Sequence, residues 1–460
     1  MEHYAQECIG VTDGDFEFTP DLAAVMGKIS EENRWVSQQT DKPSVSVAYW
    51  IALDQKDPAS VGLRHQLQGA YLAQRRVNRA VGRQPLIRLL VANAGKENEQ
   101  WKPVVTQLLG KAGAPDRLVA VAGLGRSFEA TRQAITEQAD HRMPMIASTL
   151  TADSFSLVPE EQRVRGLVRA SATNSDQVKA TVAYLKPDDQ RALLIQDTNK
   201  EDLYVRTLGE AFTAEFPDPT HTLIEPERYD SSLGGVANAF AQMMPNVCVK
   251  RPDVVYFAGR GGSVLQSFLE ALPGRPCLDF RIKVVTGNSA VHTANWVQSL
   301  PEGEWERRIG SANVTLRYGT LAHPSAWAAS PTSFSPEATR YFQQDCADCF
   351  TSLFPGGSLD DGSAIMAHDA VVTAVQAIWD ATGQRDLSTD PLTLGQVIQA
   401  LGQLHDLNAV PGASGWLSFD GNGNPVDKAV AILELKPDGT VGFAKLIAPR
   451  GAPFTSPAGA

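Results

Sequence analysis

Three hydroxyl side chains stand where the ends of two predicted strands would come together. Ser127 ends a glycine-rich turn, GLGRS, that follows the apolar run 118–122, and Thr149 and Thr151 follow the next apolar run, 144–147. Ser127 would also cap the helical pattern that comes after the turn, where unpaired N–H groups favour an anion. Hydroxyl groups and free amides at one edge of a sheet predict a pocket for a small molecule.

Each of these features also has a simpler interpretation. A serine after a glycine turn is often only a helix cap, and a threonine in a loop is often only solvated. The GLG sequence is also the beginning of a dinucleotide-binding fingerprint. The third glycine position of that fingerprint holds Phe128, however, and no acidic residue clearly ends the next strand.

The cysteines and histidines do not form a convincing catalytic or metal-binding pattern. Cys248 and Cys277 each precede a predicted strand and could form a disulfide if those strands are neighbours, which would favour an oxidising compartment. Cys346 and Cys349 form a CxxC within a helical pattern, and the pairing of these two and of Cys8 stays open. Because there is no second CxxC, no HExxH, no P-loop and no nucleophile elbow, we expect no metal, no cofactor and no enzyme.

The composition is that of a folded globular protein with an acidic balance. The chain has 460 residues, of which 43% are hydrophobic and 20% charged, and its formal net charge is −11. This charge argues against nucleic acid as the main partner. No apolar run approaches the about 18 residues of a membrane span, and the first residues lack the apolar core of an export signal. We therefore expect an export signal or anchor to be absent from this chain.

Strands and helices alternate in two successive runs, from about 44 to 153 and from about 154 to 290. Such alternation predicts parallel sheets covered by helices on both faces, and two runs predict two α/β lobes whose strand ends face a shared cleft. The predicted strands are 44–53, 87–94, 118–122, 144–147, 167–172, 191–196, 220–224, 252–258 and 282–286. Further helical patterns follow at 336–350, 363–381 and 393–404, and the pattern after 416 is antiparallel, with three strands.

Several stretches, in this order, resemble the type 1 periplasmic solute-binding proteins, in particular the branched-chain amino-acid-binding branch. VSVAYWIAL is similar to the first strand of that family, and AGLGRSFEAT with PMIASTLTA resembles its ligand-carboxylate motif. LLIQDTNKEDLYVRTLGEAF resembles the strand and helix that open the second lobe. AIMAHDAVVTAVQAIWDA and GASGWLSFDGNGNPV resemble a helix and a hairpin near its end. The resemblance covers roughly 44–446.

The resemblance implies two doubly wound, Rossmann-like lobes joined by a multi-strand hinge. Lobe 1 would comprise 44–153 and 324–412, and lobe 2 would comprise 154–323 and 413–450. Residues 1–43 would be an N-terminal helical extension or stalk, and 451–460 a flexible tail.

The resemblance also assigns ligand-binding roles to single residues. Ser127 and the backbone of its turn, including Gly125 and Arg126, would hold a ligand carboxylate. Thr149 and Thr151 would bind carboxylate and amine groups.

Three further roles fall on the second lobe. Tyr204 would reach across the cleft. Arg260 stands where the family often has an aromatic residue, and it would suit a second anionic group or pair with an acidic residue across the cleft. Asn288 stands where the family has the acidic residue that binds the α-ammonium group, so a common branched-chain amino acid is a doubtful ligand.

The implied function is binding of a small polar solute, an amino acid or a related carboxylate or amide, by closure of the lobes about the hinge. The implied partners are the permease of an ABC transporter or a fused membrane sensor, in an extracytoplasmic, secreted or membrane-anchored setting. Two alternatives stay open, which are a cytoplasmic ligand-sensing regulator on the same fold and a doubly wound enzyme.

Overall fold

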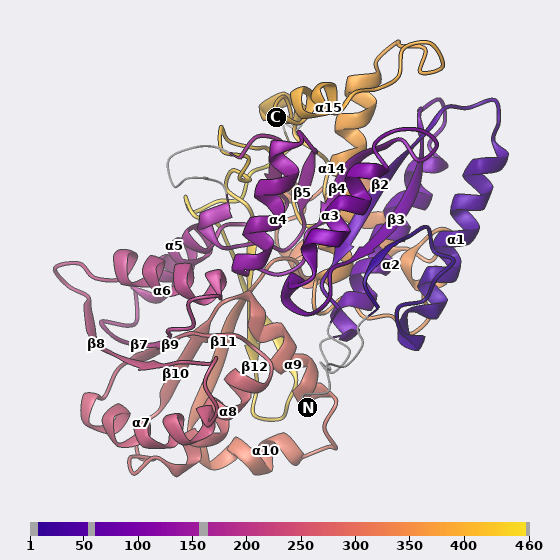
Figure 1. Cartoon of the computed structure of the whole chain (residues 1–460). Helices are drawn as coiled ribbons and strands as arrows, with labels where there is room; N and C mark the ends of the chain where they lie inside the picture. The colour runs from indigo at the N-terminus through magenta and orange to yellow at the C-terminus, as the bar shows by residue number, and fades with distance from the viewer. Residues whose placement is uncertain (1–7, 54–59, 156–163, 457–460) are drawn as a thin grey trace.

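The computed structural model describes residues 8–53, 60–155 and 164–456, and these form two lobes (Figure 1). Each lobe is built on one sheet, and helices cover both faces of each sheet. The fold class predicted from the sequence, two doubly wound α/β lobes, is therefore confirmed. The remaining residues of the predicted N-terminal extension and C-terminal tail, 1–7 and 457–460, lie outside the described part.

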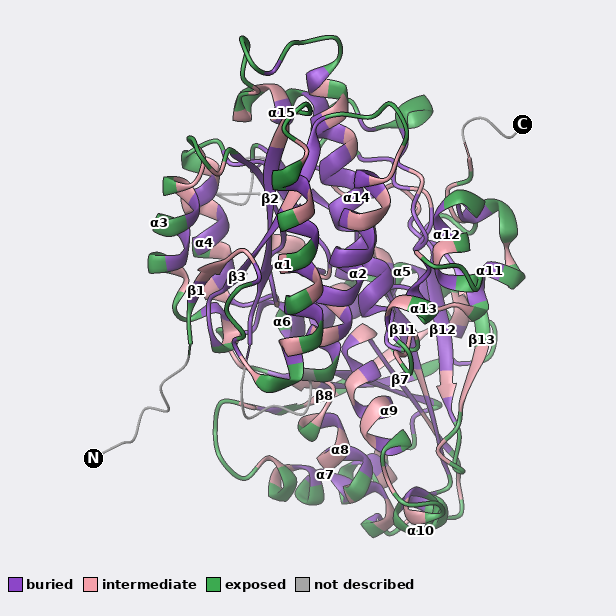
Figure 2. Ribbon diagram, turned by 90° about the vertical axis from the view of Figure 1, so that its right-hand side faces the viewer, coloured by how far each residue is buried: buried purple, intermediate pink, exposed green. Residues whose placement is uncertain are grey.

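The sheet of lobe 1 has six strands. In spatial order they are β1 (Gly10–Thr12), β3 (Leu86–Asn93), β2 (Ser44–Ile51), β4 (Leu118–Gly123), β5 (Met145–Ala147) and β6 (Leu167–Arg169). All neighbours pair in parallel except β1, which runs antiparallel to β3. Their apolar runs are continuous because both faces of the sheet are buried, as Figure 2 shows.

Successive side chains of β2 alternate between the two faces of this sheet. Val47 and Tyr49 join one apolar cluster, and Ala48 and Trp50 join the other. The helices that cover the first face are α1 (Ala23–Gln38), α2 (Ser60–Asn78), α12 (Pro336–Gln343), α13 (Phe350–Leu353), α14 (Ser363–Thr382) and α15 (Leu394–Leu401). Those that cover the second are α3 (Trp101–Gly110) and α4 (Glu129–Asp140).

The sheet of lobe 2 has seven strands. In spatial order they are β13 (Val441–Ile447), β12 (Val430–Leu435), β11 (Val314–Thr320), β10 (Ile282–Thr286), β9 (Val254–Ala258), β7 (Arg191–Asp197) and β8 (Thr222–Tyr229). Helices α5 (Asn174–Leu185) and α6 (Leu203–Glu215) lie on one side of the sheet. On the other side lie α7 (Val236–Lys250), α8 (Ser263–Ala271), α9 (Val291–Gln298) and α10 (Glu304–Ile309) (Figure 1).

Three connections cross between the lobes in the described part of the chain: after β6, after β11 and before β12. Helix α11 (Ser325–Ala329) lies on the second. Arg169, 1% exposed, joins the first connection to the third through bonds of 3.0 and 2.6 Å from its guanidinium to the Asn424 side-chain oxygen. Burial lowers the pKa of Arg169 to about 10. A buried cation thus links two of the three connections that form the predicted multi-strand hinge.

The structure corrects three predictions, which concern the N-terminal segment, the boundary between the lobes and the strands of lobe 2. The segment 8–43 is part of lobe 1 and not a separate extension, because β1 joins the sheet and Leu22, Met26 and Ile29 enter its core. Strand β6 pairs with β5, so the first sheet continues past the boundary at 153. Strand β11 was not predicted, and in the region of 416–426 only isolated bridges form instead of the first strand of the expected antiparallel set.

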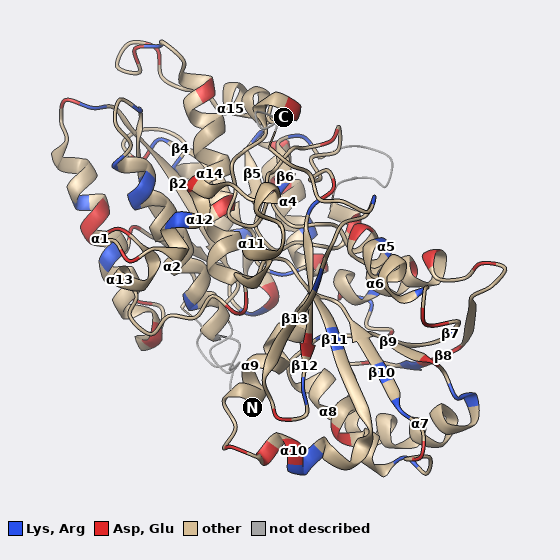
Figure 3. Cartoon of the chain, turned by 180° about the vertical axis from the view of Figure 1, so that it is seen from behind, with Lys and Arg blue, Asp and Glu red and all other residues tan. Residues whose placement is uncertain are grey.

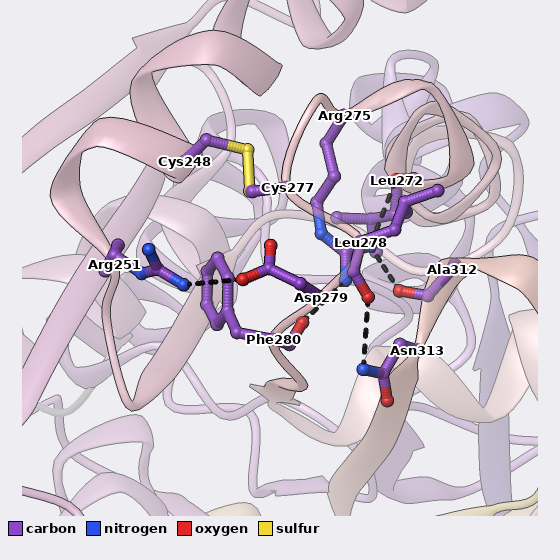
Figure 4. Close-up of a disulfide and its surroundings, with 10 residues drawn as sticks. All are labelled: Cys248, Arg251, Leu272, Arg275, Cys277, Leu278, Asp279, Phe280, Ala312 and Asn313. Atoms are coloured by element: carbon purple, nitrogen blue, oxygen red, sulfur yellow. Dashed lines mark hydrogen bonds and ion pairs between the residues drawn. A yellow bond between two sulfur atoms is a disulfide. The ribbon is translucent and has the colours of Figure 1, made fainter.

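Four of the five cysteines form disulfides. Cys248, at the end of α7, is bonded to Cys277, before β10, with 5.6 Å between their Cα atoms (Figure 4). The strands that follow them, β9 and β10, are neighbours, which was the condition for this pair. Cys346 and Cys349 are bonded to each other. They lie in an irregular segment between α12 and α13 and not in the predicted helix. Cys8 is free and exposed.

The charged residues are mixed over both lobes, as Figure 3 shows. Among the described residues, the helices are too short or too polar to cross a membrane.

Candidate functional site

The GLGRS turn after β4 is held rigidly at the strand end by a buried asparagine. The Asn98 side chain accepts a bond from Trp50 Nε1 (2.8 Å) and donates to the Leu124 carbonyl (3.2 Å) and to Thr131 Oγ1 (2.7 Å). Gly125 has a φ of 74°, and a β-carbon there would lie 2.7 Å from Asn98 Nδ2. Only glycine fits this position without strain.

The turn of lobe 1 contacts the beginning of α6 in lobe 2 directly. The Ser127 carbonyl accepts the backbone N–H of Leu203 (3.1 Å) and that of Tyr204 (3.4 Å). Next to it, Phe128 and Asp202 form an isolated antiparallel bridge. The turn after β4 and the beginning of α6, which were predicted to face each other across a cleft, are therefore in direct contact. The two lobes are closed against each other at this point.

Arg260, from the loop after β9, lies in the middle of this junction. Its guanidinium binds both carboxylate oxygens of Asp202, at 2.6 and 2.8 Å, and donates to the Ser127 carbonyl at 3.3 Å. It also lies 4.7 Å from the ring centres of both Phe128 and Tyr204, one from each lobe. Burial acts to lower the pKa of Arg260, but the Asp202 carboxylate outweighs it and the pKa is raised. Arg260 thus forms an ion pair, but its partner lies in its own lobe and not across the cleft, so the predicted pairing across the cleft is wrong.

Tyr204 and Asn288 lie next to one another in lobe 2. The Tyr204 hydroxyl accepts bonds from the backbone N–H and the hydroxyl of Ser289, at 3.3 and 3.2 Å. Burial raises the pKa of Tyr204. The neighbouring Asn288 is half-buried, and its Oδ1 is fully buried without a hydrogen-bond partner among the described residues. A buried amide oxygen of this kind needs a donor, which a bound molecule could supply.

The hydroxyl residues of lobe 1 gather around the same turn. The Thr149 hydroxyl lies 3.4 Å from a carbonyl oxygen of the GLGRS turn, and Ser127 Oγ lies 3.5 Å from the backbone N of Ala152. Thr151 lies between Thr149 and Ala152 in the chain and is 1% exposed. Its backbone carbonyl accepts the Asn174 N–H at 2.6 Å. The structure thus brings the lobe 1 candidates together at the strand ends.

Sequence reasoning missed two acidic residues of the junction. Asp202 caps α6 through the backbone N–H groups of Tyr204 and Val205, and an Asp before a helical pattern could have revealed it. Glu97 follows β3 in a positive-φ conformation, and nothing in the sequence pointed to it. Burial raises the pKa of Glu97, while nearby cations that include Arg260 act in the opposite direction.

A second meeting of the lobes lies at the first turns of α2, α14 and α9. A β-carbon on Gly62 would be 3.6 Å from Ser363 Oγ and 3.8 Å from His292 Cε1, which belongs to lobe 2. His65 and Asp361 form a buried pair at 2.7 Å beside it. The junction therefore extends from the GLGRS turn to these helix beginnings, with polar groups at both ends.

This arrangement has the architecture of the type 1 periplasmic binding proteins, so the fold implied by the sequence resemblance is confirmed. No known protein-family profile and no curated protein matches the chain in sequence.

Solved structures match it over nearly their whole length. One is the leucine-binding protein LivK from Thermotoga maritima, with 16% identity, a TM-score of 0.63, and coverage of 88% of this chain and 99% of that one. Another is LivJ from Streptococcus pneumoniae in complex with isoleucine, with 15% identity, a TM-score of 0.60, and coverage of 88% and 100%. A third is a solute-binding protein from R. palustris in complex with benzoate, with 14% identity, a TM-score of 0.58, and coverage of 91% and 100%.

Proposed function

We propose that this protein is an extracytoplasmic solute-binding protein, or a ligand-sensing ectodomain, that binds a small polar solute between its two lobes. The observation that carries the proposal is the junction itself. Hydroxyl residues of lobe 1 and Tyr204, Arg260 and Asn288 of lobe 2 converge there on a fold whose similar structures are solute-binding proteins. The proposed action is binding and closure, without chemical conversion of the solute.

The polar groups favour a solute with one carboxylate or amide group. Ser127, Thr149 and Thr151 offer hydroxyl groups, and Asn288 Oδ1 offers an acceptor for an N–H or O–H group of the solute. Arg260 does not suit a second anionic group, because Asp202 already compensates its charge. A neutral amide in place of a carboxylate at 288 weakens an α-ammonium contact by about 1.5–3 kcal/mol.

The two disulfides support an oxidising compartment over a cytoplasmic regulator. We also propose that the partner of the closed, solute-bound protein is the permease of an ABC transporter or a fused membrane sensor. Its support is that similar structures are described as substrate-binding proteins of ABC transporters.

The test is a thermal-shift screen against amino acids, monocarboxylates, dicarboxylates and amides, followed by calorimetry of any hit. A solute that binds the native state raises the midpoint by mass action. Ser127→Ala and Thr151→Ala should abolish the shift and leave the fold intact. Ser299→Ala and Thr106→Ala remove the same groups from exposed positions that are not among the junction residues and should respond like the parent.

If both junction variants respond like the parent, the assigned site is in the wrong place. Chemical conversion of a hit during the incubation would instead favour the alternative that this protein is an enzyme with a doubly wound fold.

A further inference from the structure

Lobe 2 contains a cavity that the proposed solute site does not use. It has a volume of about 530 Å³ and lies between α6, the end of β7 and the edge strand β8. Pockets for small organic molecules commonly range from about 300 to 1,000 Å³. Its lining includes neither Ser127, Thr149 and Thr151 nor Asn288. It is therefore distinct from the proposed cleft site.

The cavity exists because α6 covers only part of the sheet. Helix α6 packs over β7 and β9 through its apolar residues. Strand β8 lies beyond them at the edge of the sheet (Figure 1), and all its residues except Tyr229 are half-buried or exposed. A second stripe of α6, formed by the helically spaced residues 206, 209, 210, 213 and 214, forms one wall of the resulting hollow.

The floor of the cavity is fixed by Gln196 of β7. Its side-chain amide donates to the Val205 carbonyl at 3.0 Å, and a β-carbon on Gly209 would lie only 1.4 Å from its Oε1. Glycine at 209 is thus required for this close packing of helix on strand. The floor and walls are consequently formed by groups that the fold holds in place before any ligand binds.

The charges and apolar surfaces of the cavity specify a class of ligand. Lys200, Arg206 and Arg228 contribute cationic side chains from three different elements, and Asp197 and Glu210 are the acidic residues that line it. Arg228 also pairs with Glu225 at 3.5 Å, but both side chains are more than half exposed, so this pair is weak and a ligand anion can compete with it. The Oδ1 of the buried Asp197 is engaged by the backbone N–H groups of Asn199 and Ser231, at 3.1 and 3.0 Å. Leu194, Ala214 and Pro226 add apolar surface.

We propose that this cavity binds a small organic anion, a carboxylate or sulfonate attached to an apolar group. Arg228 lies beside Gln196 in the register of β7 and β8, so it shares the face of the sheet that forms the floor. Arg206 faces it from α6. The anionic group is held between these two guanidinium groups, and the apolar portion lies against Leu194, Ala214 and Pro226. The charged rim determines the sign of the ligand's charge, and the apolar wall limits the size of its apolar group.

The experiment uses 1-anilinonaphthalene-8-sulfonate as the probe, because it is anionic, apolar and fluoresces when it is shielded from water. We expect saturable binding of one probe to the folded protein. Arg206→Gln with Arg228→Gln should weaken it at least about tenfold, since each charged hydrogen bond has about that effect. Ala214→Trp, at an exposed position of the wall, should fill the cavity and abolish binding.

Two controls separate this site from general adsorption. Lys179→Gln with Arg281→Gln removes two exposed cations of lobe 2 outside the cavity and should leave the binding constant unchanged. The uncharged N-phenyl-1-naphthylamine should bind the parent and the double arginine variant equally. The proposal is overturned if the probe does not bind, if neither cavity variant changes its affinity, or if the control variant weakens it as much as the arginine variant does.

Discussion

Replacing Arg260 by glutamine separates the two kinds of contact that this side chain makes. Within lobe 2 the guanidinium pairs with Asp202, whose side chain is 2% exposed, while its own is 21% exposed. Between the lobes it donates to the Ser127 carbonyl and lies over the ring of Phe128. The first contact affects the stability of the fold, and the second affects the equilibrium between open and closed lobes.

The structure gives a magnitude for each part. One hydrogen bond from a charged donor to a carbonyl, at 3.3 Å, contributes about 1.5 kcal/mol, and one cation–π contact contributes about 0.5–1 kcal/mol. Arg260→Gln should therefore disfavour closure by about 2 kcal/mol, which is about a 30-fold change in the closing constant. Loss of the largely buried pair with Asp202 should lower the free energy of unfolding by about 3 kcal/mol.

Two assays measure these effects separately. The unfolding free energy comes from guanidinium titration. The closing equilibrium comes from the radius of gyration of the protein in solution, measured by small-angle X-ray scattering with and without a solute from the screen. We expect the ligand-free variant to be more extended than the parent, and its solute affinity to fall in proportion to the fraction of closed molecules.

Phe128→Leu is the matched control, because it removes the ring from the junction but leaves the pair of Arg260 with Asp202 intact. It should reduce the closing constant only about two- to fivefold. If Arg260→Gln lowers the unfolding free energy while the radius of gyration and the solute affinity stay at the parental values, then Arg260 acts only within lobe 2. The interpretation of the junction as a closing contact would then be wrong.

Three more predictions concern other parts of the chain. Lys428 is 1% exposed and burial lowers its pKa to about 8, so between pH 8 and about 10 the unfolded chain binds a proton that the folded chain does not. The unfolding free energy should consequently rise with pH over that window, by up to about 3 kcal/mol, and a pH series of guanidinium titrations should show no such rise for Lys428→Met. Cys248→Ser with Cys277→Ser opens a loop closed over 29 residues and should lower the unfolding free energy by about 3–4 kcal/mol in the same titration; a loss below about 1 kcal/mol would contradict this. Asn288→Asp should increase the affinity for α-amino acids at least about tenfold by calorimetry, whereas unchanged leucine binding would show that this side chain does not contact the ammonium group.

The parts of the fold that were predicted from sequence are those set by local pattern. The bounds of β4, α4 and β5 were predicted to within about two residues, because a buried strand, a positive-φ glycine turn and a helical stripe each leave a short-range signal. The predicted cap was wrong, since Phe128 and not Ser127 is the N-cap residue of α4 and no side chain caps this helix. The Cys248–Cys277 disulfide could be predicted from the sequence for a similar reason, since each cysteine precedes one of two successive strands.

The parts that were missed depend on contacts between distant segments. Pairing of Gly10 with Asn93 makes β1 a strand, and no pattern within three residues reveals it. Strand β11 is central because β12 returns antiparallel beside it, more than 100 residues later in the chain. In the site, Arg260 could be named from its position but its partner could not, because Asp202 comes from a different loop.

The contacts between the lobes limit what a solute has to add. The N–H groups that meet the Ser127 carbonyl would bind water in an open form, so each contributes only about 0.5–1.5 kcal/mol to closure, and the lost freedom of the lobes opposes it. A solute shifts the equilibrium only through contacts that it makes better in the closed form. Arg260 is satisfied by Asp202, whereas Asn288 Oδ1 is buried without a partner in the part of the chain that the structure describes. Selectivity for the solute should therefore depend on Asn288 and the hydroxyl groups of lobe 1, and closure in the absence of solute should depend on Arg260.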